Sequence, residues 1–245
     1  MTTYKGIRGL TIRTVAGDPS TLLAGDIWYS NTTRKIRGAK LVGAWATGGT
    51  GTTARKTAGG GGTQTAAWIA GGETVAIHEQ YDGSSWSEVA DLNTARYGMY
   101  GTGTQTAGLV AAGTDGSTRQ TISEEWNGTS WTEGNNTTGD RQDGASAGTQ
   151  TAALGIGGAD YPALPLDVES YDGTTWSEIA NINTGGYYVK GNGIQTAALI
   201  GGRIRFDAPG TANIAIAEIW DGSSWSETGD FNTGRAYDTA CFGTS

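Results

Sequence analysis

Short apolar runs separated by polar, glycine-rich turns recur along this chain of 245 residues. The most regular of them read "AAWIAGG", "AGLVAAG", "AALGIGG" and "AALIGG", and each follows a "GTQT" or "GIQT" turn. An apolar run this short between glycines favours a buried β-strand over a helix, which needs about ten residues or more. Because no long pattern of helical period accompanies these runs, the chain is predicted to be all-β.

The apolar runs belong to a longer repeat. Its most recognisable part is an eight-residue motif that reads "YDGSSWSE" from Tyr81, "YDGTTWSE" from Tyr171 and "WDGSSWSE" from Trp220. The tryptophan of the motif recurs at intervals of 41, 45, 45 and 49 residues, at Trp45, Trp86, Trp131, Trp176 and Trp225. Such intervals are typical of the four-stranded blades of β-propellers.

Each repeat is predicted to hold four strands, two around the "GTQT" turn and two around the Asp-Gly or Asn-Gly of the motif. That second turn suits either a two-residue hairpin or a four-residue loop. Side chains that recur in every repeat usually have a structural role, so we expect the tryptophans to pack within or between blades. We expect a glutamate and a glutamine of each repeat to bond buried backbone groups or arginines of neighbouring blades. These are Glu79, Glu124, Glu169 and Glu218, with Gln64, Gln105, Gln150 and Gln195.

Five tryptophan positions predict five blades, because radial closure hides sheet edges that an open array would expose. Four blades are continuous in sequence, over about residues 52–91, 93–136, 138–181 and 183–230. The fifth is expected to be composite, with its innermost strand from residues 233–245 and its outer strands from residues 36–48. The predicted domains are therefore an N-terminal arm and hairpin over 1–35, for anchoring or assembly, and a propeller over 36–245.

Charge divides the chain unevenly. Residues 1–44 carry seven Lys or Arg against two Asp, a balance of plus 5, whereas the remainder carries 9 basic and 22 acidic residues, minus 13. The acidic body should repel nucleic acid. The basic arm either docks on an acidic surface or neutralises the body of its own chain, and its candidate anchor residues are Lys5, Arg8 and Arg13.

The sequence offers little for catalysis. His78 is the only histidine and Cys241 the only cysteine, so neither a zinc or copper site with several histidines nor an internal disulfide is possible. We expect no catalytic residue, no metal and no cofactor. The first fifteen residues lack the apolar core of a signal peptide, and no segment has membrane-spanning length, so synthesis in a reducing cytoplasm without membrane insertion is expected.

The repeat resembles known families. Its order of paired glycines, an aromatic residue, Trp and a downstream Arg resembles the kelch repeat. The wording "LNTAR", "GTQTA" and "YDGSSW", after "GDIWYSNTTRKIRG", is similar to kelch-like structural proteins of tailed bacteriophages. The resemblance implies a five-bladed kelch-like β-propeller, a place in the virion, and a non-enzymatic role in the tail, a fibre or the particle surface.

Recognition is expected where the repeats differ. The link between the paired glycines and the glutamate strand varies in length, and loops on a rigid scaffold commonly carry binding sites. The candidate partner-binding residues in these links are Tyr161, Leu164, Leu166, Arg203, Arg205 and Phe206. The alternative is that the longer links only cover blade edges.

The expected partners are other virion proteins or further copies of this chain. The main rival function is a carbohydrate-binding, lectin-like module for host attachment, since exposed Trp and Tyr can stack on the sugar rings of a host-surface glycan. A glycan-degrading enzyme ranks third, because every ionisable residue type in the repeat recurs and no distinctive acid and base pair stands out.

Overall fold

The computed structural model describes residues 13–15, 27–38, 48–73, 75–159, 165–208 and 210–234. Every regular element in these ranges is a β-strand, and none of the residues described is helical. Within them, accordingly, no helix of a length and apolarity suited to crossing a membrane is found. The prediction of an all-β chain is confirmed. The chain divides into two compact units, Met1–Thr47 and Gly48–Ser245.

The first unit contains a small sheet of order β1-β2-β3. β2 (Ile27–Ser30) and β3 (Lys35–Gly38) form an antiparallel hairpin, and β1 (Arg13–Val15) pairs with β2 in parallel. Arg34 adopts a left-handed conformation, with φ of 55°, at the turn of the hairpin. A hairpin is thus present in this part of the chain, and it extends to Gly38.

The second unit contains four four-stranded antiparallel sheets, which are the blades. The first contains β4 (Gly59–Thr63), β5 (Ala66–Ala70), β6 (His78–Tyr81) and β7 (Trp86–Val89), and the second contains β8 (Tyr100–Thr104), β9 (Ala107–Ala111), β10 (Ser123–Trp126) and β11 (Trp131–Glu133). The third contains β12 (Ala145–Thr149), β13 (Ala152–Ile156), β14 (Val168–Tyr171) and β15 (Trp176–Ile179), and the fourth contains β16 (Lys190–Ile194), β17 (Ala197–Ala208), β18 (Gly210–Trp220) and β19 (Trp225–Glu227).

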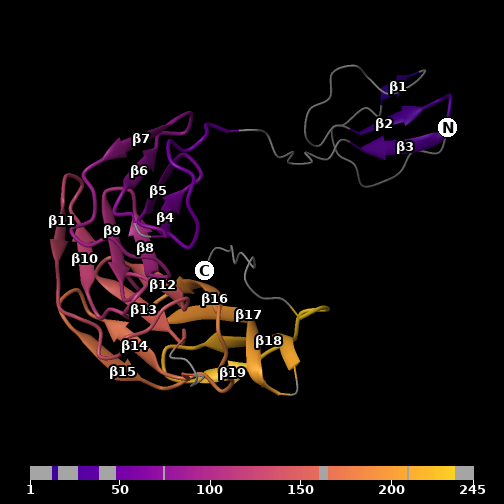
Figure 1. Ribbon diagram of the computed structural model, residues 1–245. Coiled ribbons are helices and arrows are strands. Elements are labelled where there is room, and N and C mark those ends of the chain that lie inside the picture. The colour runs from indigo at the N-terminus through magenta and orange to yellow at the C-terminus, as the bar shows by residue number, and fades with distance from the viewer. Residues whose placement is uncertain are drawn as a thin grey trace. The chain divides into compact units, whose positions relative to one another are not determined.

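The blades are arranged as an arc around their first strands, which confirms a β-propeller (Figure 1). β4 contacts β8, β8 contacts β12 and β12 contacts β16, whereas no comparable contact joins β16 to β4 among the described strands. Four blades are therefore present in the described residues, not five. Of the predicted composite blade, residues 36–38 pair with β2, residues 48, 233 and 234 lie in no strand, and 39–47 and 235–245 fall outside the description.

The recurring motif forms a four-residue loop rather than a two-residue hairpin. Tyr81 pairs with Trp86, so the loop consists of residues 82–85. The Asp82 carboxylate accepts hydrogen bonds of 2.8 Å from the backbone N–H groups of Ser84 and Ser85, and these bonds lower the pKa of Asp82 to about 2. Gly83 has a φ of 95°, a conformation that disfavours any side chain with a β-carbon. The motif recurs because each blade needs this loop before its tryptophan strand.

Neighbouring blades pack face to face. We call the face that meets the preceding blade the leading face and the opposite one the trailing face. On the leading faces the residue before the loop and the tryptophan after it form buried pairs, which are Trp126 with Trp131, Tyr171 with Trp176 and Trp220 with Trp225. On the trailing faces a large apolar residue of the second strand meets them, as Trp68, Leu109 and Leu154 do. In each interface between blades, an aromatic pair of one blade therefore packs against a leucine or tryptophan of the preceding blade.

At the two ends of the arc, a leading face and a trailing face are not covered by another blade among the described residues. On the trailing face of the fourth blade, Leu199 is 41% exposed, although Leu154 at the same repeat position is 1% exposed. Ile194 and Ile219 are exposed on the same face. At the other end, Tyr81 and Trp86 on the leading face of the first blade are only half-buried. Both end faces have the composition of an interface between blades.

Candidate functional site

The central feature of every blade is a glutamate buried on the third strand. These residues are Glu79 on β6, Glu124 on β10, Glu169 on β14 and Glu218 on β18. Each carboxylate binds the segment that leads into its own blade, about thirty residues earlier in the chain. We call this arrangement the glutamate clamp.

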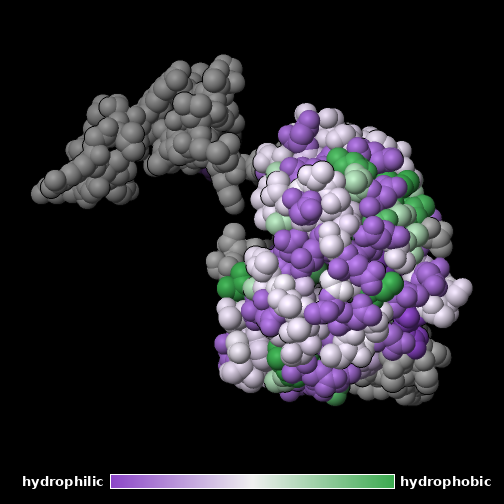
Figure 2. Space-filling view, turned by 90° about the vertical axis from the view of Figure 1, so that its left-hand side faces the viewer, coloured by the Kyte–Doolittle hydropathy of each residue, from purple (hydrophilic) through white to green (hydrophobic). Residues whose placement is uncertain are grey.

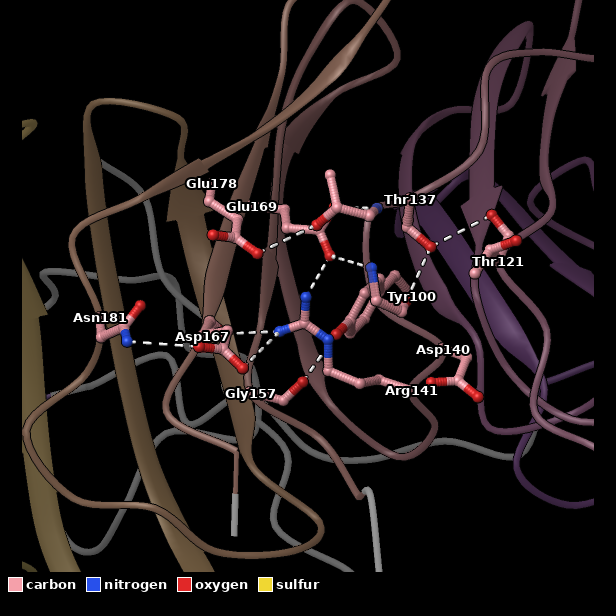
Figure 3. Close-up of polar contacts among 12 residues, drawn as sticks. Tyr100, Thr121, Thr137, Asp140, Arg141, Gly157, Asp167, Glu169, Glu178 and Asn181 are labelled. Atoms are coloured by element: carbon pink, nitrogen blue, oxygen red, sulfur yellow. Dashed lines mark hydrogen bonds and ion pairs between the residues drawn. The ribbon is translucent and has the colours of Figure 1, made fainter. Parts of the chain in front are cut away.

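Figure 3 shows the clamp of the third blade. The backbone N–H groups of Thr138 and Gly139 donate to the two oxygens of Glu169, at 2.7 and 3.2 Å. The guanidinium of Arg141 forms a buried ion pair with the same carboxylate and donates to the carbonyl oxygen of Asp167 at 3.0 Å. Donors thus occupy both oxygens of Glu169, so the whole carboxylate is engaged in contacts within the protein.

The other blades repeat this geometry. In the second blade Asn93 donates to Glu124 through its backbone N–H at 2.7 Å and its side chain at 2.9 Å, and Arg96 completes the ion pair. In the first blade Thr52 and Arg55 bind Glu79 in the same way. In the first three blades this buried ion pair therefore attaches the entering segment to the sheet.

The fourth blade obtains its arginine from another place. Gly186 stands at the repeat position of Arg55, Arg96 and Arg141. Arg203 of β17 supplies the guanidinium instead, with its Nη1 atom 3.1 Å from Glu218. A β-carbon on Gly186 would lie 2.8 Å from Cγ of Arg203, so glycine leaves room for the replacement.

The assignment of Arg203 to a partner-binding loop is therefore wrong. Its side chain is completely buried. It forms an ion pair with Glu218 and donates to the carbonyl oxygen of Thr184. Of the other candidates in these links, Leu166 is 37% exposed. Arg205 and Phe206 lie in the long hairpin of β17 and β18, and Tyr161 and Leu164 are outside the described residues.

The structure also places the remaining predicted residues. Side-chain amides of Gln105, Gln150 and Gln195 each donate to backbone carbonyls of the preceding blade, at 2.6–3.4 Å. Gln64, at the open end of the first blade, is exposed. Among the anchor candidates Arg13 begins β1, whereas Lys5 and Arg8, like Trp45, lie outside the described residues.

His78 lies in the interface between the first two blades. Its Nδ1 atom is 3.1 Å from the indole nitrogen of Trp131, which donates, and its ring contacts Trp126 edge to face at a centroid distance of 4.5 Å. Burial lowers the pKa of His78 to about 4. The imidazole is therefore a neutral part of an aromatic core. In the described part of the chain no group of three or more His, Cys, Asp or Glu is placed to hold a metal.

A feature that was not predicted from the sequence lies where the first strands of the four blades begin. Twelve residues after the repeat tryptophan, each blade has a residue in the left-handed conformation, namely Thr57, Gly98, Asp143 and Tyr188, with φ of 55–65°. The Gly98 N–H donates to the Thr57 carbonyl, and the Asp143 N–H donates to the Gly98 carbonyl, both at 2.7 Å. These residues border a cavity of about 320 Å³. The equal spacing was a signal, but the unlike side chains obscured it.

Replacing the buried Arg203 tests the exchanged arginine. Arg203→Ala should lower the free energy of unfolding by about 3–5 kcal/mol, because it removes one partner of a buried ion pair. Adding Gly186→Arg should restore part of this loss, since Gly186 has an ordinary backbone conformation and the site of the Arg203 side chain is then free. Urea denaturation of the two single variants and the double variant measures the coupling.

Gly186→Arg alone is the control and should destabilise the protein by steric conflict. Strictly additive effects of the two substitutions would show that they do not share one site.

The buried imidazole predicts a dependence of stability on pH. In the unfolded chain His78 titrates near 6.5, whereas the folded pKa is about 4. Between these values the unfolded state binds a proton that the folded state does not, so stability should fall as the pH drops from about 6.5 to about 4. The loss approaches about 3 kcal/mol. His78→Gln should have a flatter profile, measured by urea unfolding at several pH values, and parallel profiles for the two proteins would contradict the assignment.

Comparison with known proteins places the chain in no family. No family model matches the sequence, and no curated protein matches it.

Proposed function

We propose that this chain is a non-enzymatic structural component of a tailed-phage virion, in which a closed five-bladed propeller acts as a rigid scaffold for protein contacts. The main support is the glutamate clamp: the glutamates and arginines that recur in every blade bind one another and the backbone. Side chains engaged in this way stabilise the fold and are not free to take part in catalysis. The resemblance of the repeat to kelch-like phage proteins supports a location in the virion.

The end faces support closure by a fifth blade. Residues 233–245 continue the repeat with an arginine ten positions after Trp225, as the chain does after the tryptophans of the first and second blades. In this proposal, residues 235–245 form the innermost strand beside β16, and residues 36–48 contribute outer strands. The cover would bury Leu199, Ile194 and Ile219 as the fourth blade buries Leu154.

Partner contacts are assigned to the projecting parts of the scaffold. The side of the blades seen in Figure 2 is dominated by hydrophilic residues, with small separate hydrophobic areas. By contrast, β17 and β18 have 12 and 11 residues where the other blade strands have three to five, so their hairpin extends beyond the blade. We assign this hairpin, with Arg205 and Phe206, and the basic arm to contacts with other virion proteins.

A matched pair of substitutions tests the closure. Leu154→Ala should cost about 2–5 kcal/mol of stability, the usual effect of truncating a buried leucine. If a fifth blade covers the last trailing face, Leu199→Ala should cost nearly as much in the full chain, and much less in a chain that lacks residues 235–245. Urea denaturation of the four proteins measures this. A small effect of Leu199→Ala in the full chain, below about 1 kcal/mol, would mean that the face is open.

The location in the particle tests the function itself. Phage particles that carry the gene should contain the protein after density-gradient purification, as detected by mass spectrometry and by immunogold labelling. A protein abundant in the infected cell and missing from the particles would refute the proposal. Lys5→Glu with Arg8→Glu should reduce incorporation, because reversal of charge disrupts docking on an acidic surface. Arg34→Glu with Lys35→Glu, the same change of charge at exposed positions, is the control.

A further inference from the structure

The cavity at the starts of the first strands is bordered by residues that differ between blades. It lies next to the starts of β4, β8, β12 and β16, and its lining includes Lys56, Met99 and Lys190 as well as the left-handed residues. The backbone conformation recurs in all four blades, but the side chains at that position are those of Thr, Gly, Asp and Tyr. Chemical divergence within a conserved geometry is expected of a site that recognises one particular ligand.

Three of the four left-handed positions hold a residue other than glycine, although this backbone conformation favours glycine. The left-handed region disfavours residues with a β-carbon, and Gly98 shows that the fold accepts glycine at this position. Thr57, Asp143 and Tyr188 nevertheless occupy it. Conformations of this kind gather at binding sites, where the surrounding structure holds them in place.

Asp143 is the most constrained of these residues. Its side chain is buried, and its Oδ2 atom accepts a hydrogen bond of 2.9 Å from the side chain of Gln142. A carboxylate has capacity for further donors. A β-carbon on Gly98 would lie 2.8 Å from Oδ1 of Asp143, so the glycine makes room for this carboxylate at the cavity.

The formal charges at the cavity balance. Lys56 forms an ion pair with Glu73 at 3.2 Å, and the lining contains one further cation, Lys190, and one carboxyl group, Asp143. A charged ligand would leave one of these charges uncompensated, whereas a neutral ligand would preserve the balance. The ligand should therefore be neutral and should carry both donors and acceptors.

We propose that this cavity binds a neutral saccharide residue. Its hydroxyl groups would donate to the Asp143 carboxylate and accept from the ammonium groups of Lys190 and Lys56. The C–H groups of its ring would pack on Met99 and Tyr188. A cavity of about 320 Å³ lies within the size range of small-ligand sites. This assignment gives the lectin-like hypothesis a defined location, and it does not depend on the virion role.

Saturation-transfer NMR on the full chain tests the proposal. The probes are the methyl glycosides of glucose, galactose and mannose, and N-acetylglucosamine, each at millimolar concentration, followed by titration calorimetry of the strongest. At least one probe should bind. Asp143→Asn should weaken its binding by at least about tenfold, and Gly98→Ala should do the same because it displaces the carboxylate.

Asp140→Asn is the matched control, since it makes the same chemical change at an exposed carboxylate outside the cavity, and it should leave Kd unchanged. Thermal melting verifies that each variant is folded. The proposal is overturned if no probe binds, if Asp143→Asn and Gly98→Ala bind as tightly as the unchanged protein, or if inorganic phosphate displaces the sugar. None of these results bears on whether the protein is found in phage particles.

Discussion

The arrangement of the four blades depends on a carboxylate that each of them buries on its third strand. The entering segment of a blade has no strand partner of its own, and its N–H groups would otherwise lie unpaired in the interior. Glu169 satisfies two of them and also holds Arg141. In a low-dielectric interior such bonds are strong, and the loss of any member leaves its partners buried without compensation. The clamp therefore fixes where each first strand begins, and with it the position of the cavity beside these strands.

The fourth blade shows that the fold requires a guanidinium beside the buried glutamate, and that the arginine can come from a different position in the repeat. A guanidinium reaches Glu218 from β17, and the expected site contains a glycine that accommodates it. The conserved quantity is the electrical neutrality of the blade interior. A repeat can thus exchange which strand provides a group as long as the buried pair survives.

The sequence was sufficient for the parts of the structure that recur. Equal spacing of Trp86, Trp131 and Trp176 predicts the blades, and the alternation of faces follows from the periodicity of strands. The role of Arg203 could not be predicted in this way. Its segment looks like a link of variable length in the sequence, but it continues strand β17 in the structure. The left-handed residues were likewise hidden, since Thr57, Asp143 and Tyr188 share a backbone conformation and no side-chain chemistry.

The two end faces of the arc differ in kind, one being aromatic at Tyr81 and Trp86 and the other aliphatic at Leu199 and Ile219. Two molecules that meet through these faces would join the first blade of one to the last blade of the other. Such a heterologous contact generates a ring if the rotation between successive copies closes, and a fibre if it does not. A covering segment of the same chain, as proposed for residues 235–245, would compete with this contact at an effective concentration of the order of millimolar. Because residues 235–245 are synthesised after all four blades, closure by this segment would have to compete with such association in every newly made molecule.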